Sequence, residues 1–257
     1  MNIAQFVEKY EAFCPKELAE AGDPVGLQIG SMDKEVHKVL VTLDIREQTV
    51  REALENQVDL IFAKHPVIFR PLSNLTDLNS QEKIVLELAK AGIAVYTSHT
   101  NIDIVDGGMN DWFAEAFGLT EVEPLTELGV GRIGNLVKAQ PLKTVVEKAR
   151  QVFGQERLRL VTYEHSLSQE IRRVAICGGS GGKFWPEALA KGADLYITAD
   201  IYYHTGHDIC STPMTVIDPG HYMERIFIPK VAEILHEFSP NVEILESQAY
   251  TNPFYDI

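Results

Sequence analysis

Three segments of the sequence that are typical of β-strands each end in residues that could bind a metal ion. The polar residues that follow these strands are Lys64 and His65 after residues 61–63, His99 and Asp103 after residues 93–97, and His221 and Glu224 after residues 214–218. Imidazole and carboxylate groups that meet in a cleft suit divalent ions such as Zn, Fe or Mn, and such a centre activates water. If the three strands are neighbours in one sheet, these side chains converge at one edge of that sheet.

Each of these residues also has an ordinary structural alternative. A single histidine after a strand is most often structural, Asp103 could simply form a turn, and His221 and Glu224 lie three residues apart, as surface pairs on helices do. However, an Asp-Pro-Gly sequence precedes His221 and places this pair at a strand-to-helix turn, where functional sites are common. The coincidence of three such strand ends favours a metal site over separate structural roles.

Composition and charge exclude several classes of protein. The net charge of −14 argues against nucleic-acid binding, which depends on Lys and Arg. The three cysteines are widely spaced and form no CxxC pair, which indicates a reducing compartment. Residues 1–10 predict a short amphipathic helix rather than a signal peptide, and no apolar run approaches the length of a membrane span, so we expect a cytoplasmic protein.

The chain contains an internal repeat, because residues 38–65 align without a gap on residues 173–200. Only six of the 28 aligned positions are identical, but both copies predict a strand, a helix and a second strand, which favours a parallel pair with a crossover helix. We therefore predict an α/β fold of two related halves, with mostly parallel or mixed sheets and a metal cleft between them. The first domain is expected at residues 1–125 and the second at residues 126–257, with residues 214–238 returning to the shared cleft.

The repeat also bears on the site, because it aligns His65 with Asp200. Ligands of open α/β sheets bind outside the carboxyl ends of the strands, so the segment from Asp200 to His204 is expected near the same region. Further helices are expected at residues 81–91, 109–117 and 142–153, each followed by a glycine. A helix at residues 221–238 contains Pro229, which should kink it or begin a new segment, and residues 242–246 predict the last strand.

Two glycine-rich segments could bind phosphate. Residues 129–134 match the pattern GxGxxG, but neither a strong strand nor a clear helix flanks them, which excludes a dinucleotide-binding motif. Residues 178–182 lie between a strand and a helix, where the backbone of Gly179, Ser180 and Gly181 could hold a phosphate group. The alternative is a tight turn that only glycine can form, and the sequence leaves both open.

Six motifs together resemble the NIF-three-like family, whose members carry the name GTP cyclohydrolase 1 type 2 homolog. The motifs occupy residues 23–30, 64–69, 98–103, 129–134, 178–182 and 220–224. They appear in order along the chain, which resembles the short form of the family without an inserted middle domain. The resemblance implies a two-domain protein with a dinuclear metal centre and a toroidal homohexamer. It also implies four metal ligands, His65, Asp103, His221 and Glu224, with Asp103 as a bridging ligand.

The sequence departs from the family pattern at Lys64, where the family often has a second histidine, and at Pro24, where asparagine is expected. The first departure affects the second metal ion, which could bind more weakly or recruit His99 or His204. Alternatively, Lys64 could contact an anionic substrate. One or two divalent ions per chain are therefore expected.

These residues indicate a metal-dependent hydrolase for a phosphorylated or nucleotide-like small molecule. In this mechanism a metal-bound water attacks the substrate, and His99 and His204 carry protons. The alternative is a non-enzymatic protein in which the same centre serves as a metal store, a chaperone or a regulatory scaffold for a protein partner.

Overall fold

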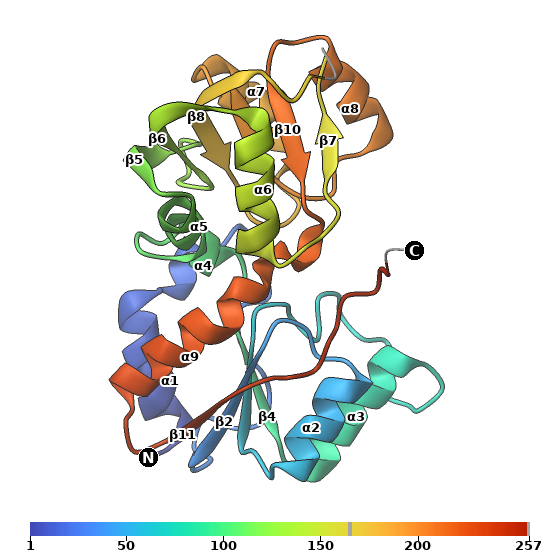
Figure 1. The fold of residues 1–257 in the computed structure, drawn as a ribbon. Helices are drawn as coiled ribbons and strands as arrows, with labels where there is room; N and C mark the ends of the chain where they lie inside the picture. The colour runs from blue at the N-terminus through green and yellow to red at the C-terminus, as the bar shows by residue number, and fades with distance from the viewer. Residues whose placement is uncertain (164–165, 256–257) are drawn as a thin grey trace. The chain divides into compact units, whose positions relative to one another are not determined.

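The computed structural model describes residues 1–163 and 166–255. Contacts between residues divide the chain into two compact units (Figure 1). The first contains Met1–Val105 and Ile226–Tyr255, and the second contains Asp106–Arg225. Each unit has its own sheet, which confirms the predicted α/β fold of two halves with mixed sheets.

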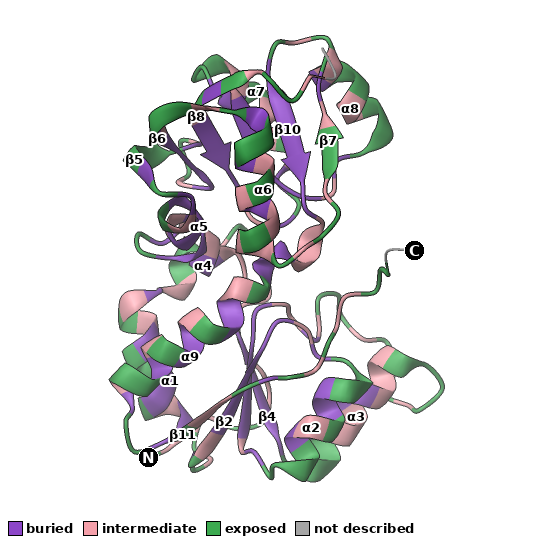
Figure 2. Cartoon of the chain, viewed as in Figure 1, coloured by how far each residue is buried: buried purple, intermediate pink, exposed green. Residues whose placement is uncertain are grey.

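The first unit is a five-stranded sheet between two pairs of helices (Figure 1). Its strands, in spatial order, are β1 (Gly26–Ile29), β4 (Ala94–Thr97), β3 (Leu60–Ala63), β2 (Lys38–Thr42) and β11 (Glu243–Glu246). Only β1 runs antiparallel to its neighbour. The helices are α1 (Ile3–Phe13) and α9 (Phe227–Phe238) on one face, and α2 (Glu47–Glu55) and α3 (Ser80–Ala91) on the other. Because both faces are covered, every residue of β3 and β4 is buried (Figure 2).

The second unit is built on a six-stranded mixed sheet. Its strands, in spatial order, are β5 (Leu119–Pro124), β6 (Arg132–Pro141), β8 (Glu170–Ile176), β9 (Leu195–Ile197), β10 (Thr215–Asp218) and β7 (Arg159–Val161). Helices α5 (Met109–Phe117) and α6 (Leu142–Phe153) pack on β6 and β8, whereas α8 (Tyr203–Cys210) packs on β10 and β7. The remaining helices are α4 (Thr100–Ile104) in the first unit and α7 (Trp185–Ala190) in the second, with short 3₁₀ segments at Lys16–Leu18, Gly182–Phe184 and His221–Ile226. Within residues 1–163 and 166–255, no helix combines the length and the apolar character needed to cross a membrane.

The predicted repeat is confirmed at the level of single hydrogen bonds. Strands β2 and β3 of the first copy are a parallel pair, and so are β8 and β9 of the second. In each copy an aspartate directly before the second strand accepts two backbone N–H groups from residues that lie in the first strand or directly precede it. These bonds run from His37 and Lys38 to Asp59 Oδ2 at 2.8 and 3.1 Å, and from Arg172 and Arg173 to Asp194 Oδ2 at 2.9 and 2.8 Å.

Both copies also have the same backbone turn after the repeated helix. Gln57 has a φ of 55° and Gly192, its counterpart, has a φ of 73°. The N–H of Gln57 donates to the carbonyl of Leu54 at 3.1 Å, and that of Gly192 donates to the carbonyl of Leu189 at 2.9 Å. The two copies therefore share one left-handed turn, although only the second has the residue that suits it.

The structure corrects one expectation about the strands. Strands β3 and β4 are parallel neighbours, but β10 belongs to the sheet of the second unit. The three strands that precede the candidate ligands are therefore not neighbours in one sheet. Strand β10 pairs with β9 instead, so its carboxyl end lies beside the strand that leads to Asp200.

The C-terminal helix is divided as Pro229 suggested. The segment begins as a 3₁₀ helix at His221–Ile226, and α9 begins at Phe227. Pro229 lies in the first turn of α9, where its missing N–H costs no intrahelical hydrogen bond.

The compact units divide the chain between residues 105 and 106 and between residues 225 and 226, whereas the sequence placed one boundary at residues 125 and 126. Helix α5 goes with the second unit because it packs on β6 and β8, and α9 goes with the first because it packs on β2 and β11.

Candidate metal centre

His65 lies directly after β3, in a backbone position fixed by a hydrogen bond from its N–H to the carbonyl of Leu43 at 3.0 Å. Its ring Nδ1 lies 2.8 Å from Asp44 Oδ1, and the other carboxylate oxygen of Asp44 accepts the hydroxyl of Thr251 at 2.6 Å. Burial raises the pKa of Asp44, but the hydrogen bonds from His65 and Thr251 outweigh it and keep the pKa below its usual value. An ionised Asp44 fixes the proton of His65 on Nδ1, which leaves Nε2 to bind a metal ion.

Lys64, the residue before His65, is fully buried. Its side chain is 1 % exposed, and its ammonium lies 3.0 Å from Oδ2 of Asp103 on α4. The structure therefore brings together the two residues that the sequence linked to a second metal ion. It joins them as an ion pair.

His99 forms a second histidine–carboxylate pair in the same unit. Its Nδ1 lies 2.7 Å from Asp23 Oδ1, and Asp23 also accepts the N–H of Thr100 at 3.0 Å. Burial raises the pKa of Asp23, but the hydrogen bonds from His99 and Thr100 bring it down to about 2. Burial lowers the pKa of His99, so the ring is a neutral base at pH 7, and its centroid lies 5.8 Å from that of His65.

His221 in the second unit lies between two carboxylates. Its Nδ1 is 2.6 Å from Asp200 Oδ2, and its Nε2 is 3.2 Å from Glu224 Oε2. Burial lowers the pKa of His221, but the two carboxylates outweigh this effect and raise it to about 10. Without a metal ion the imidazolium thus satisfies both carboxylates. A divalent ion could take the place of the Nε2 proton between His221 and the buried Glu224.

The glycine loop at residues 178–182 packs closely against this pair. A Cβ atom on Gly179, whose φ is 59°, would lie 2.6 Å from Glu224 Oε1. The N–H of Gly181 donates to Thr198 Oγ1 at 3.0 Å, and the hydroxyl of Ser180 donates to Asp200 Oδ2. These contacts support the tight-turn alternative, and phosphate binding by Gly179, Ser180 and Gly181 stays a prediction.

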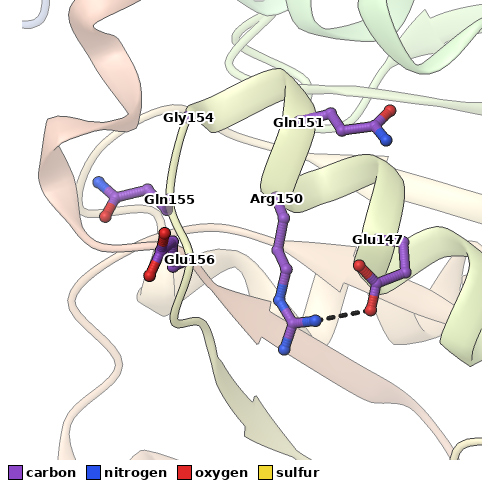
Figure 3. A pocket seen from close by; sticks show the side chains of 6 residues that line it. All are labelled: Glu147, Arg150, Gln151, Gly154, Gln155 and Glu156. Carbon is purple, nitrogen blue, oxygen red and sulfur yellow. Dashed lines mark hydrogen bonds and ion pairs between the residues drawn. The ribbon is translucent and has the colours of Figure 1, made fainter.

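Two further regions lie apart from these contacts within the second unit. His204 is exposed at the beginning of α8, where its ring packs edge-on against Tyr203 with 5.4 Å between centroids. A pocket lies at the end of α6 and in the segment that follows it (Figure 3). Its lining residues are Glu147, Arg150, Gln151, Gly154, Gln155 and Glu156. They provide one ion pair, between Arg150 and Glu147 at 2.6 Å, and neither histidine nor cysteine.

The orienting carboxylates Asp44 and Asp23 were missed at the level of sequence. Asp44 could have been found by the rule that found His65, because it follows the carboxyl end of β2. Asp23 lies in one of the family motifs, but nothing near it in the sequence indicated a contact with His99.

His65 in the first unit and His221 and Glu224 in the second offer the ligand types of a divalent-metal site, namely two imidazole nitrogens and a carboxylate oxygen. With the duplicated fold, these residues place the chain in a class of α/β proteins that consist of two related units and carry ligand residues suited to a divalent metal ion. The chain belongs to the Duf34/NIF3 (NGG1p interacting factor 3) family, whose sequence model matches residues 1–253. This confirms the resemblance derived from the six motifs.

Relatives with the same overall length support the assignment. The chain is 61 % identical to a "GTP cyclohydrolase 1 type 2 homolog" of Lactococcus lactis subsp. lactis (strain IL1403) over 258 residues, which cover 100 % of both chains. It is 49 % identical to the protein of the same name from Streptococcus pneumoniae serotype 4, again over 100 % of both chains. The crystal structure of a Bacillus cereus protein related to NIF3 superposes with a TM-score of 0.95 and 27 % identity, covering 100 % of this chain and 99 % of that one. The chain is thus a short family member.

Proposed function

We propose that this protein binds a divalent metal ion through His65, His221 and Glu224 and uses it to hydrolyse a phosphorylated or nucleotide-like small molecule. The observation that carries the proposal is the same device at both histidines. Asp44 binds Nδ1 of His65, and Asp200 binds Nδ1 of His221, so that Nε2 of each ring is the atom that would bind the metal ion. The name GTP cyclohydrolase 1 type 2 homolog, carried by the similar proteins, agrees with a nucleotide-like substrate.

The residues of the chain divide the work as follows. When bound, the metal ion would lower the pKa of a water molecule and polarise the substrate. His65, His221 and Glu224 bind the ion, and the mixed donor set suits Zn, Fe or Mn. His99 accepts a proton, because it is neutral and Asp23 fixes its tautomer.

The other predicted site residues have supporting roles in the proposal. His204 is a second candidate proton carrier, and the loop at Gly179, Ser180 and Gly181 is a candidate contact for phosphate. Asp103, the predicted bridging ligand, is close enough to Lys64 for an ion pair.

The Lys64–Asp103 pair also favours a second candidate function. A buried ammonium that neutralises a carboxylate of a metal centre leaves the structure of the centre intact. It removes part of the catalytic capacity, because that carboxylate is then paired with the protein's own charge. A non-enzymatic metal-binding, chaperone or regulatory scaffold protein fits this observation. The predicted homohexamer would then be a scaffold for a protein partner.

The test combines metal content with turnover. Wild type and His221→Ala would be loaded with Zn, Mn or Fe(II), freed of unbound metal and assayed against a panel of phosphoesters and nucleotides. His236→Ala is the control, because His236 is an exposed histidine on α9. We expect His221→Ala to lose metal and hydrolysis together, and the control to keep both. Stoichiometric metal without turnover on any substrate would refute the hydrolase and favour the scaffold.

A further inference from the structure

Lys64 is one of the largest fully buried side chains of the protein. Lysine is almost never fully buried unless its charge is paired, because removing an ammonium from water is costly. The ammonium of Lys64 meets this condition through Asp103, at 3.0 Å from Oδ2. The residue therefore places an ammonium, paired with a carboxylate, in the interior of the first unit, next in sequence to the candidate ligand His65.

The backbone holds this charge in place. The N–H of Lys64 donates to the carbonyl of Thr42 at 3.1 Å, which continues the hydrogen-bond pattern between β2 and β3. Asp103 is fixed in turn by α4, whose end is closed by the N–H of Val105 donating to the carbonyl of Asn101 at 3.0 Å. Lys64 directly follows β3 and Asp103 lies on α4, so backbone hydrogen bonds fix the positions of both partners.

A metal ion and this ammonium would compete for the same carboxylate oxygen. Metal–carboxylate distances are about 2.0–2.2 Å, so an ion on Oδ2 of Asp103 would lie close to the ammonium and be repelled by it. The positive charge also reaches neighbouring groups. Burial lowers the pKa of His99, and the charge of Lys64 lowers it further.

We infer that the ammonium of Lys64 is a built-in counter-ion that closes Asp103 to a second metal ion, so that each chain binds one divalent ion. The inference rests on the proposed metal site at His65, His221 and Glu224. It makes Asp103 a carboxylate neutralised by the protein itself. A histidine at position 64 would remove the charge and add a ligand, which would open a second site next to the first.

The experiment counts metal ions per chain. Wild type would be dialysed to equilibrium against ZnCl₂ or MnCl₂, and the bound metal and protein would be quantified by elemental and amino-acid analysis. We expect one ion for wild type, two for Lys64→His and one for Lys148→His. The last is a matched control, since Lys148 donates to the backbone carbonyl of Phe117 and is not paired with a carboxylate there.

A double variant covers the case in which Lys64→His does not fold. Lys64→Met/Asp103→Leu replaces the whole ion pair by apolar groups, a change that buried pairs often tolerate. We expect it to bind one ion with a dissociation constant within about threefold of wild type, because Asp103 is not a ligand in the native protein. A loss of affinity of tenfold or more would show that Asp103 is a ligand.

The outcomes separate this inference from the proposed function. Two ions in wild type, or one ion in a folded Lys64→His variant, would overturn the role of Lys64 and leave the metal site intact. No bound ion in wild type would overturn the metal site and the inference with it.

Discussion

The repeated turn at Gln57 and Gly192 gives a quantitative prediction about stability. Gln57 has a φ of 55°, and a left-handed conformation costs a residue with a Cβ roughly 1–2 kcal/mol. Glycine removes this cost but adds about 0.4–1 kcal/mol of chain entropy in the unfolded state. We therefore expect Gln57→Gly to stabilise the first unit by about 1 kcal/mol.

The reverse change at the equivalent position should have the opposite sign. Gly192 has a φ of 73°, and an added Cβ would meet nothing within 4 Å. Gly192→Gln should therefore destabilise the second unit by about 1 kcal/mol, which is the backbone strain less the entropy that glycine adds to the unfolded chain. Steric overlap makes no contribution to this value.

Urea unfolding would measure both changes as shifts of the transition midpoint at constant slope. A 1 kcal/mol change with a slope of about 2 kcal/mol/M corresponds to about 0.5 M urea. Asn56→Gly is the control, because Asn56 has a φ of −86° and gains no relief from glycine. It should destabilise the protein by about 0.5–1 kcal/mol. Equal destabilisation by Gln57→Gly and Asn56→Gly would refute the strain at Gln57.

Three further predictions concern the candidate site. Thr251→Val removes the hydroxyl that holds Asp44, so we expect metal affinity to fall about tenfold in a calorimetric titration; unchanged affinity would mean that the hydroxyl does not support the site. The pKa of Asp23 is lowered from 3.8 to about 2, so its stabilisation, at most about 2 kcal/mol, is present above pH 4 and is lost as the pH falls toward 2. Asp23→Asn should lower the melting temperature at pH 7 and flatten its decline between pH 5 and pH 2, and an unchanged decline would contradict the assignment. Gly179→Ala would place a Cβ 2.6 Å from Glu224 Oε1, so we expect metal binding at least tenfold weaker in the same titration, and wild-type affinity would count against a role for this turn.

The helices were predictable where local chemistry alone decides them. Helices α5 and α6 have the predicted bounds, Met109–Phe117 and Leu142–Phe153. Both are closed by a glycine in the left-handed conformation, Gly118 at a φ of 66° and Gly154 at a φ of 62°. Glycine is the one residue that takes this conformation without strain, so the sequence alone marks the ends of these helices.

The partners of the strands were less predictable, because strand pairing joins segments that are far apart in the chain. Strand β11 is the last strand of the sequence, yet it pairs in parallel with β2 in the sheet of the first unit. Strand β10 joins the second sheet by pairing with β9 and β7. The apolar pattern of a buried strand shows that it is buried, but it contains no information about the neighbour that buries it.

The same limit applies to the candidate site. His65 and His221 were predictable because imidazoles after buried strands are few and have a known chemistry. The support of His65 was not, because Thr251 is 207 residues away from Asp44 in the sequence. Only the folded C-terminal segment brings this hydroxyl to the carboxylate.

The duplication explains how one arrangement arises in both units with the roles exchanged. The repeat places His65 and Asp200 at equivalent positions, each after the second strand of its copy. In the first unit the histidine at this position is held by Asp44, whereas in the second unit the aspartate at this position holds His221. The same bond between Nδ1 and a carboxylate thus forms in both units, but the candidate ligand and the residue that orients it have changed places. Because the second unit takes its histidine from outside the repeat, a substitution that makes the two copies identical at this position, Asp200→His, would remove the carboxylate at Nδ1 of His221 and weaken the metal site.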